Sequence, residues 1–328
     1  MLKFKKMENK LNLREKIHFF PITSFAVVMG LTGLTIAFGK FYHLQWLPKI
    51  FYDISIFTVL FLFVLFSILY GLKLALYPDE VKIDFKHRIR INFFSAISIS
   101  LLLLSIAFYT YFPLLSISFW WLGTILHTIF MYKTISFWIQ HNFEIQHFNP
   151  AWFIPVVGNI LVPISGVEYA PVIISYFYFA VGFFFWIVLF TIFLYRVIFH
   201  AQLPEKFIPT FFIILAPPAV GFISYMRITM SWDTMSIFLL FMTYFFIGLL
   251  AVMYKSFTQL KFFMSWWAFT FPLAAATIAS AVAYQVTQFL FFEIMAWLML
   301  ISAIVAISIV AWVTIKNIRK QEICIKEE

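Results

Sequence analysis

The sequence predicts an all-α polytopic membrane protein. Its ten transmembrane helices would form five helical hairpins in a quasi-fivefold arrangement, with the odd-numbered inner helices lining a pore. The 328 residues are 63% hydrophobic and 11% charged, whereas soluble domains carry about 25% charged residues. Apolar runs of span length, about 20 residues each, recur to the end of the chain. The prolines gather in alternate runs, which indicates two classes of helix.

Ten apolar segments follow from the polar breaks between them, with ends uncertain by about 2–4 residues. A basic N-terminus before an apolar run is typical of a signal peptide, but the first run is span-length and nine more follow, so we expect it to be retained. The connections are short, and residues 1–328 form one transmembrane domain with tails at about 1–17 and 316–328. The segments are 18–39, 51–76, 90–111, 114–139, 151–166, 168–199, 206–227, 233–255, 262–284 and 287–315.

Proline separates the odd-numbered segments from the even-numbered ones. Deep in a helix, proline removes a backbone hydrogen bond and bends the chain, and in lipid the freed carbonyl needs a protein or water neighbour. Four hairpin steps of about 63 residues separate Pro21 from Pro272, although the third segment has no proline. The pattern predicts bent inner helices around a water path and straight outer helices. The odd segments hold Pro21, Pro155, Pro163, Pro209, Pro217, Pro218 and Pro272, while among even segments only Pro171 lies inside, in a first turn.

Basic residues predict the orientation, because cytoplasmic loops of membrane proteins are enriched in Lys and Arg. With the N-terminus inside, 20 basic residues lie on the cytoplasmic side and three on the other, namely Lys40, Lys49 and Arg227. Both termini are therefore expected in the cytoplasm, with the chain as a multi-pass protein of the cell membrane. The net charge of +9 reflects topology, and no nucleic-acid partner is expected.

Ionisable residues are absent from the centres of the odd segments, which argues against a proton-coupled pump. Small and hydroxyl residues there either pack helices together or line a neutral pore. Acids begin several even segments, where they complement the positive helix end or form an acidic outer vestibule. These acids are Asp53, Glu168, Asp233 and Glu293.

Few side chains offer catalytic or metal-binding chemistry. His127, in the fourth segment, is either hydrogen-bonded between helices or a proton carrier. His141, Glu144 and His147 recur at a spacing of three but lack a fourth ligand, so no metal and no cofactor are expected. No nucleotide loop, nucleophile elbow or HExxH pattern appears, which leaves a membrane-embedded enzyme unsupported.

Phe271 stands beside Pro272 inside the ninth segment. A ring held at a helix break either packs against neighbouring helices or points into the axis and occludes it, since hydrophobic constrictions gate pores. Composition and spacing alone leave both alternatives open.

Four stretches resemble the tellurite-resistance/dicarboxylate transporter family, which includes bacterial TehA and the plant guard-cell slow anion channels (SLAC type). Residues 20–25, with Phe-Pro-Ile-Thr-Ser-Phe, are similar to the first helix of that family. Residues 90–95, 149–159 and 266–274 resemble its third, fifth and ninth helices. The matches occur in the expected order over most of the chain.

The resemblance implies a homotrimer in a lipid bilayer, in which each protomer passes small inorganic anions such as chloride or nitrate through its own pore. It implies a phenylalanine gate on helix nine, which is Phe271 by motif position. The alternative is a secondary transporter of C4-dicarboxylates or tellurite-related oxyanions, which would need a buried cation at mid-membrane. Residues expected to line the pore or mark its kinks are Pro272, Phe25, Phe94, Pro155, Gly158, Pro217 and Gly221.

Overall fold

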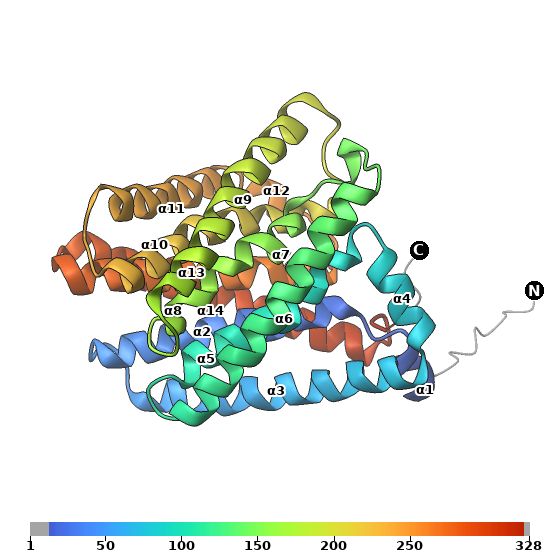
Figure 1. Ribbon diagram of the computed structural model, residues 1–328, viewed down its shortest axis with the longest axis horizontal. Helices are drawn as coiled ribbons and strands as arrows, with labels where there is room; N and C mark the ends of the chain where they lie inside the picture. The colour runs from blue at the N-terminus through green and yellow to red at the C-terminus, as the bar shows by residue number, and fades with distance from the viewer. Residues whose placement is uncertain (1–12, 325–328) are drawn as a thin grey trace, which may run out of the picture.

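The computed structural model describes residues 13–324 as a bundle of long helices that run roughly parallel or antiparallel to one another (Figure 1). Within that range, nine helical spans are long and apolar enough to cross a membrane, and Pro150–Gly166 is a shorter apolar one. The end residues of both predicted tails, with Lys3, Lys5, Lys6, Lys10 and Lys326, lie outside the described residues.

Five inner spans correspond to the odd-numbered segments. Each consists of a 3₁₀ helix that leads into an α-helix, and the third alternates twice between the two types. They are η1 (Ile22–Ser24) with α2 (Phe25–His43), η2 (Arg90–Phe94) with α5 (Ser95–Phe108), η4 (Pro150–Trp152) with α7 (Phe153–Val157), η5 (Gly158–Leu161) and α8 (Val162–Gly166), η6 (Glu205–Leu215) with α10 (Ala216–Thr229), and η7 (Met264–Phe269) with α13 (Thr270–Thr287).

Five outer spans correspond to the even-numbered segments and are uninterrupted α-helices. The predicted boundaries of all ten spans are confirmed to within four residues. The outer spans are α3 (Lys49–Leu76), α6 (Pro113–Gln140), α9 (Val172–Phe199), α11 (Thr234–Val252) and α14 (Leu290–Arg319), and the short connecting helices are α1 (Leu13–His18), α4 (Pro78–Lys86), η3 (Ile145–His147) and α12 (Lys255–Thr258).

The inner spans close into a five-membered ring. α2 packs against α5 and α13, α10 packs against α13 and α8, and the third inner span, which contains α8, contacts α5 on its other side. Each outer span packs on the inner span of its own hairpin. In the most apolar stretch of each long inner span 61–83% of residues are buried, against 22–33% in the outer spans. The predicted inner and outer rings are confirmed.

The change of helix type follows the same order in every inner span. A 3₁₀ helix joins residues three apart with poorer hydrogen-bond geometry and rarely runs beyond a few residues. Here it forms the first part of each inner span. We name the end of the bundle at which the inner spans begin, with Arg90 and Lys206, the basic face. The opposite face is the end at which the inner spans finish.

Several prolines lie at or just after the change from 3₁₀ helix to α-helix, and Pro209 lies inside η6. Pro217 occupies the first turn of α10, Pro163 the first turn of α8, and Pro272 the third position of α13. The second inner span makes the same change of type at Ser95 without a proline.

A buried ion network fixes the basic face of the first two hairpins. Lys73 and Asp84 are 4% and 3% exposed, and Lys73 Nζ lies 2.7 Å from Asp84 Oδ2. Lys73 also donates to the carbonyl oxygen of Phe20, while Arg90 Nη1 lies 2.5 Å from Asp84 Oδ1. One carboxylate therefore joins α3, α4 and η2 to the start of the first inner span.

We expect Asp84→Asn to destabilise the protein by about 3–5 kcal/mol, because it leaves the buried Lys73 ammonium without a counter-charge. Thermal unfolding of the detergent-solubilised protein, followed by size-exclusion chromatography, measures the change. Asp79→Asn is the matched control, since Asp79 lies on the same helix with 86% of its side chain exposed and pairs only with Lys82. Equal unfolding temperatures for the two variants would contradict this role of the network.

Candidate functional site

A cavity of about 750 Å³ lies inside the ring of inner spans. Its wall is mostly apolar and includes residues from all five inner spans. It begins at the basic face and ends near mid-span, because no residue beyond Met29 on α2 or Pro272 on α13 lines it. The deepest lining side chains are Met29, Ile99, Leu161, Val220 and Phe271.

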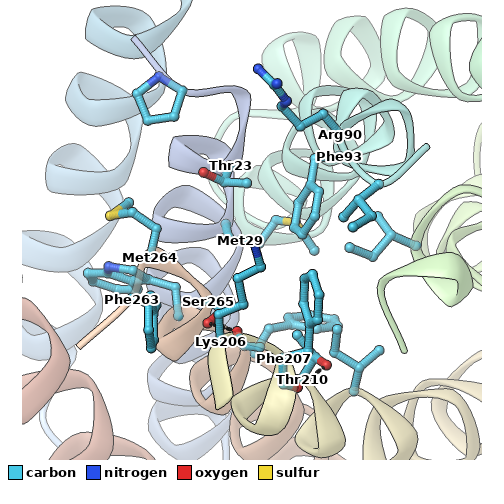
Figure 2. A pocket seen from close by; sticks show the side chains of 18 of the residues that line it. Thr23, Met29, Arg90, Phe93, Lys206, Phe207, Thr210, Phe263, Met264 and Ser265 are labelled. Carbon is cyan, nitrogen blue, oxygen red and sulfur yellow. Dashed lines mark hydrogen bonds between the residues drawn. The ribbon is translucent and has the colours of Figure 1, made fainter. Parts of the chain in front are cut away.

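The charged residues of the cavity wall lie at its mouth, where the inner spans begin. Arg90 and Lys206 approach the pocket from opposite sides, and the lysine side chain extends into the space between its neighbours (Figure 2). Arg90 shares Asp84 with Lys73, so that group keeps one net positive charge. In the described part of the chain Lys206 contacts the Phe207 ring and pairs with no acid. Glu322 also lines the mouth.

His87 lies at the same mouth but adds no charge at neutral pH. Burial, and after it the positive charge of Arg90, lowers the pKa of His87 below its ordinary value. The Nδ1 atom accepts hydrogen bonds from the backbone N–H groups of Ile89 and Arg90 at 3.1 and 3.2 Å. Both effects favour the neutral ring, so the positive potential of the mouth comes from arginine and lysine.

The side chain of Phe271 lies at the inner end of the cavity, where α13 approaches α2 most closely. A Cβ atom placed on Gly33 would lie 3.1 Å from Phe271 Cδ2, and one on Gly30 would lie 1.9 Å from Thr270 Oγ1. Only glycine permits this approach. Phe269 packs on three aromatic rings, whereas Phe271 makes no ring contact within the described residues, so sterics alone hold its ring.

Four of the eight predicted site residues line the cavity: Phe271, Pro272, Gly158 and Pro217. Gly158 forms part of the wall directly in front of His127, because a Cβ there would lie 2.7 Å from the imidazole Cε1. The His127 Nδ1 atom lies 2.9 Å from Ser98 Oγ, which is the expected hydrogen bond between helices.

Phe25 and Phe94 are not among the residues that line the cavity. Both stand at the change from 3₁₀ to α-helix, and their rings point outward into the contact between the first two hairpins. The rings around Phe25 are Phe63, Phe66 and Tyr70, and those around Phe94 are Tyr70, Phe85 and Phe130.

Pro155 and Gly221 also lie outside the cavity wall. Pro155 is buried within α7, and Gly221 faces α11, where an added Cβ would lie 3.4 Å from Leu239. Both serve helix packing in this structure. The lining role that the sequence suggested for them passes to their neighbours Ile154 and Val220.

The other candidates found in the sequence have structural partners. Glu144 and His147 cap the short helix η3, and within residues 13–324 no three His, Cys, Asp or Glu side chains are placed to hold a metal. Asp233 caps α11 by accepting from two backbone N–H groups. Glu168 pairs with Arg227 at 2.9 Å, and Asp53 with Lys49 at 3.2 Å.

Sequence reasoning assigned no cavity role to four residues that line the wall, namely Arg90, Lys206, Phe93 and Met29. The two cations counted only toward topology. Their position at the start of inner spans could have indicated a place at the cavity mouth, since the inner spans that enclose a cavity begin at its mouth. No signal distinguished Phe93 from Phe94.

Comparison with known proteins gives consistent matches. The family described as "Voltage-dependent anion channel" (SLAC1) matches residues 19–315. The chain is 30% identical over 311 residues to "Uncharacterized transporter MJ0576" of Methanocaldococcus jannaschii, covering 86% of this chain and 88% of that protein. It is 28% identical to the Arabidopsis thaliana S-type anion channel SLAH3 over 80% of this chain and 42% of the plant protein. It is 27% identical to the guard cell S-type anion channel SLAC1 of Arabidopsis thaliana over 80% of this chain and 49% of that protein.

We expect Gly30→Ala to destabilise the protein by roughly 1–3 kcal/mol, because the new methyl group overlaps the Thr270 side chain. Thermal unfolding in detergent measures the loss. Gly71→Ala is the control, since nothing lies within 4 Å of a Cβ on that lipid-facing helix. Adding Thr270→Ala to Gly30→Ala should recover part of the loss, and a Gly30→Ala protein as stable as wild type would contradict the close approach.

Proposed function

The chain belongs to the voltage-dependent anion channel family, and on that premise we propose that it is a gated channel for small monovalent anions. Chloride and nitrate would cross passively through the cavity of each protomer. The observation that carries the proposal is the cavity itself, which is lined by all five inner spans, positive at its mouth and uncharged in its depth, with Phe271 among its lining residues.

The charge distribution favours anions and disfavours tight binding. The cations Arg90 and Lys206 at the mouth raise the local concentration of anions, since a cleft lined by one sign of charge focuses the field. Deeper in the cavity an anion meets aliphatic and aromatic side chains and a few hydroxyl groups such as Thr23 and Thr210. It must therefore lose part of its hydration shell, which is less costly for a monovalent anion than for a dianion.

We propose Phe271 as the gate. Its ring stands at the inner end of the cavity, where it meets Gly33 on α2, and further residues of α13 beyond it are buried alanines. An aromatic constriction of this kind stops ions by excluding water. Rotation of one ring about its own side-chain bonds is the smallest movement that would lengthen the cavity toward the opposite face.

The alternative, a secondary transporter of dicarboxylates or oxyanions, needs a charged site that holds a dianion at mid-membrane. The charged side chains that line the described cavity, Arg90, Lys206 and Glu322, all lie at its mouth. No feature of the wall favours a dianion site over simple passage. Saturation of flux and its dependence on a proton gradient distinguish the two mechanisms.

We also propose that the basic face lies in the cytoplasm of a cell-membrane protein that assembles as a homotrimer. The distribution of Lys and Arg over the loops supports the orientation. The trimer rests on the family resemblance alone. Labelling of single introduced cysteines from either side, and mass measurement in detergent, test the two statements.

We expect Phe271→Ala to raise chloride conductance by at least about tenfold, because a barrier lowered by 1.4 kcal/mol gives a tenfold change in rate. Currents in planar bilayers, at equal reconstituted protein, measure the effect. Reversal potentials in chloride, nitrate, sulfate and malate then rank the permeant anions, and monovalent anions should come first.

Phe238→Ala is the matched control, because this phenylalanine is 47% exposed on the outer helix α11 and does not line the cavity. It should leave the conductance at the wild-type value. An unchanged current for Phe271→Ala, in protein that folds and reconstitutes normally, would count against the gate.

A further inference from the structure

The cavity inside the ring has the size and the wall of a pocket for a small organic molecule. Its volume of about 750 Å³ falls in the range of about 300–1,000 Å³ that is typical of such pockets. They are lined mostly by apolar side chains, with a few polar groups that fix the orientation of the ligand. The wall here follows this pattern, because its charged side chains lie at the mouth and its depth is aliphatic and aromatic.

The deep part of the cavity suits an alkyl chain. One side chain from each of the five inner spans lines it: Met29, Ile99, Leu161, Val220 and Phe271. None of them carries a charge, so an inorganic anion loses hydration there without gaining a partner. A methylene group instead gains free energy when it leaves water for these surroundings, and the gain grows with each carbon. The depth therefore favours the apolar part of a ligand.

The mouth of the cavity suits a carboxylate. Arg90 Nη1 lies 2.5 Å from Asp84 Oδ1, so this cation is partly neutralised by the protein. The exposed Lys206 contacts the Phe207 ring and pairs with no acid in the described residues, and its side chain extends into the space between its neighbours (Figure 2). An ammonium group donates strong charge-assisted hydrogen bonds to a carboxylate. Lys206 is therefore the group at the mouth that is available to the head of an anionic ligand.

The charges at the mouth match a single negative charge. The group formed by Lys73, Asp84 and Arg90 keeps one net positive charge. Lys206 adds a second positive charge, and the carboxylate of Glu322 on the same wall offsets one of the two. A ligand with one carboxylate neutralises the remaining charge, whereas a dianion leaves a negative charge in a mostly apolar cavity.

We propose that the cavity binds an aliphatic monocarboxylate of medium chain length, with its carboxylate at Lys206 and its alkyl chain extended toward Phe271. Such a molecule carries one charge followed by an apolar tail, in the order in which the wall presents a cation and then apolar side chains from mouth to depth. The bound molecule would fill the path of a conducted anion and block it. Only this blocking effect rests on the proposed function, since the pocket would bind the ligand in a protein that conducts nothing.

Equilibrium binding of radiolabelled octanoate to the full chain in lipid nanodiscs tests the proposal, with empty nanodiscs as the background for uptake into lipid. We expect one saturable site per chain. Unlabelled butanoate, hexanoate and octanoate should compete with affinities that rise by up to about fourfold per added methylene. Octanamide, which has the same tail without the charge, should compete at least about threefold more weakly than octanoate.

Two variants at the mouth should change the affinity for octanoate in opposite directions. Lys206→Gln should weaken binding by roughly three- to tenfold, and Glu322→Gln should strengthen it by about two- to threefold, because it removes a repelling charge. Lys255→Gln is the matched control, since this exposed lysine begins the short helix α12 and does not line the cavity. It should bind octanoate as the wild type does.

Several results would overturn the proposal. They are no saturable binding above empty nanodiscs, equal competition by octanoate and octanamide, affinity that does not rise with chain length, and equal affinities for Lys206→Gln and Lys255→Gln. A bound phospholipid that octanoate fails to displace, detected by mass spectrometry of the purified protein, would also overturn it, because the occupant would then be a membrane lipid.

Chloride currents in planar bilayers give a separable readout of the block. Octanoate added at the basic face should reduce the current by more than half at its dissociation constant for binding or a few times above it, and octanamide should do so only at higher concentration. Octanoate binding in a protein without any chloride current would contradict the proposed function and leave the pocket intact. A chloride current that saturating octanoate does not change would overturn the block.

Discussion

Lipid offers no hydrogen-bond partner to a backbone group, and the whole arrangement follows from that constraint. The inner spans depart locally from the regular α-helix that this constraint favours, because each begins as a 3₁₀ helix and most contain proline. Such segments are tolerated only where protein or water surrounds them. The outer helices supply the surrounding protein, and because each outer helix is unbroken from end to end, it satisfies its own backbone while facing lipid. The cavity is possible for the same reason, since an irregular wall is permitted around enclosed water.

Within this ring, the contact between α2 and α13 decides where the axis closes. Gly30 and Gly33 bring the two helices together, and Thr270 fills the space that the first glycine leaves. Thr270 Oγ1 donates to the carbonyl oxygen of Trp267, so the turn before Phe271 is held in place. The position of the Phe271 side chain is thus set by a rigid junction between the two helices. Its phenyl ring lacks aromatic partners in the described structure. The proposed gate would combine this rigid junction with a side chain that has no aromatic partner among the described residues.

The sequence was sufficient for the layers and the span boundaries, because proline position and run length are properties of the chain itself. It was not sufficient to choose between adjacent side chains. Phe93 lines the cavity and Phe94 packs outward, and one residue in a helix turns the side chain by about 100°. Nor is proline required for the change of helix type, since the third span makes this change at Ser95 without one. The rotation of each span depends on its neighbours, which the sequence alone does not place.

The cations at the mouth of the cavity and the uncharged interior behind them form one electrostatic design. A cation at mid-membrane would hold an anion too firmly for rapid passage, because conduction requires sites weak enough to leave. Cations placed at the mouth act differently. The water-poor interior screens charge less than bulk water does, so in the proposed channel the cations Arg90 and Lys206 at the mouth would lower the energy of an anion inside the cavity without binding it there. The barrier left in that channel would be dehydration beside Phe271, and a barrier of that kind could be removed by moving one side chain.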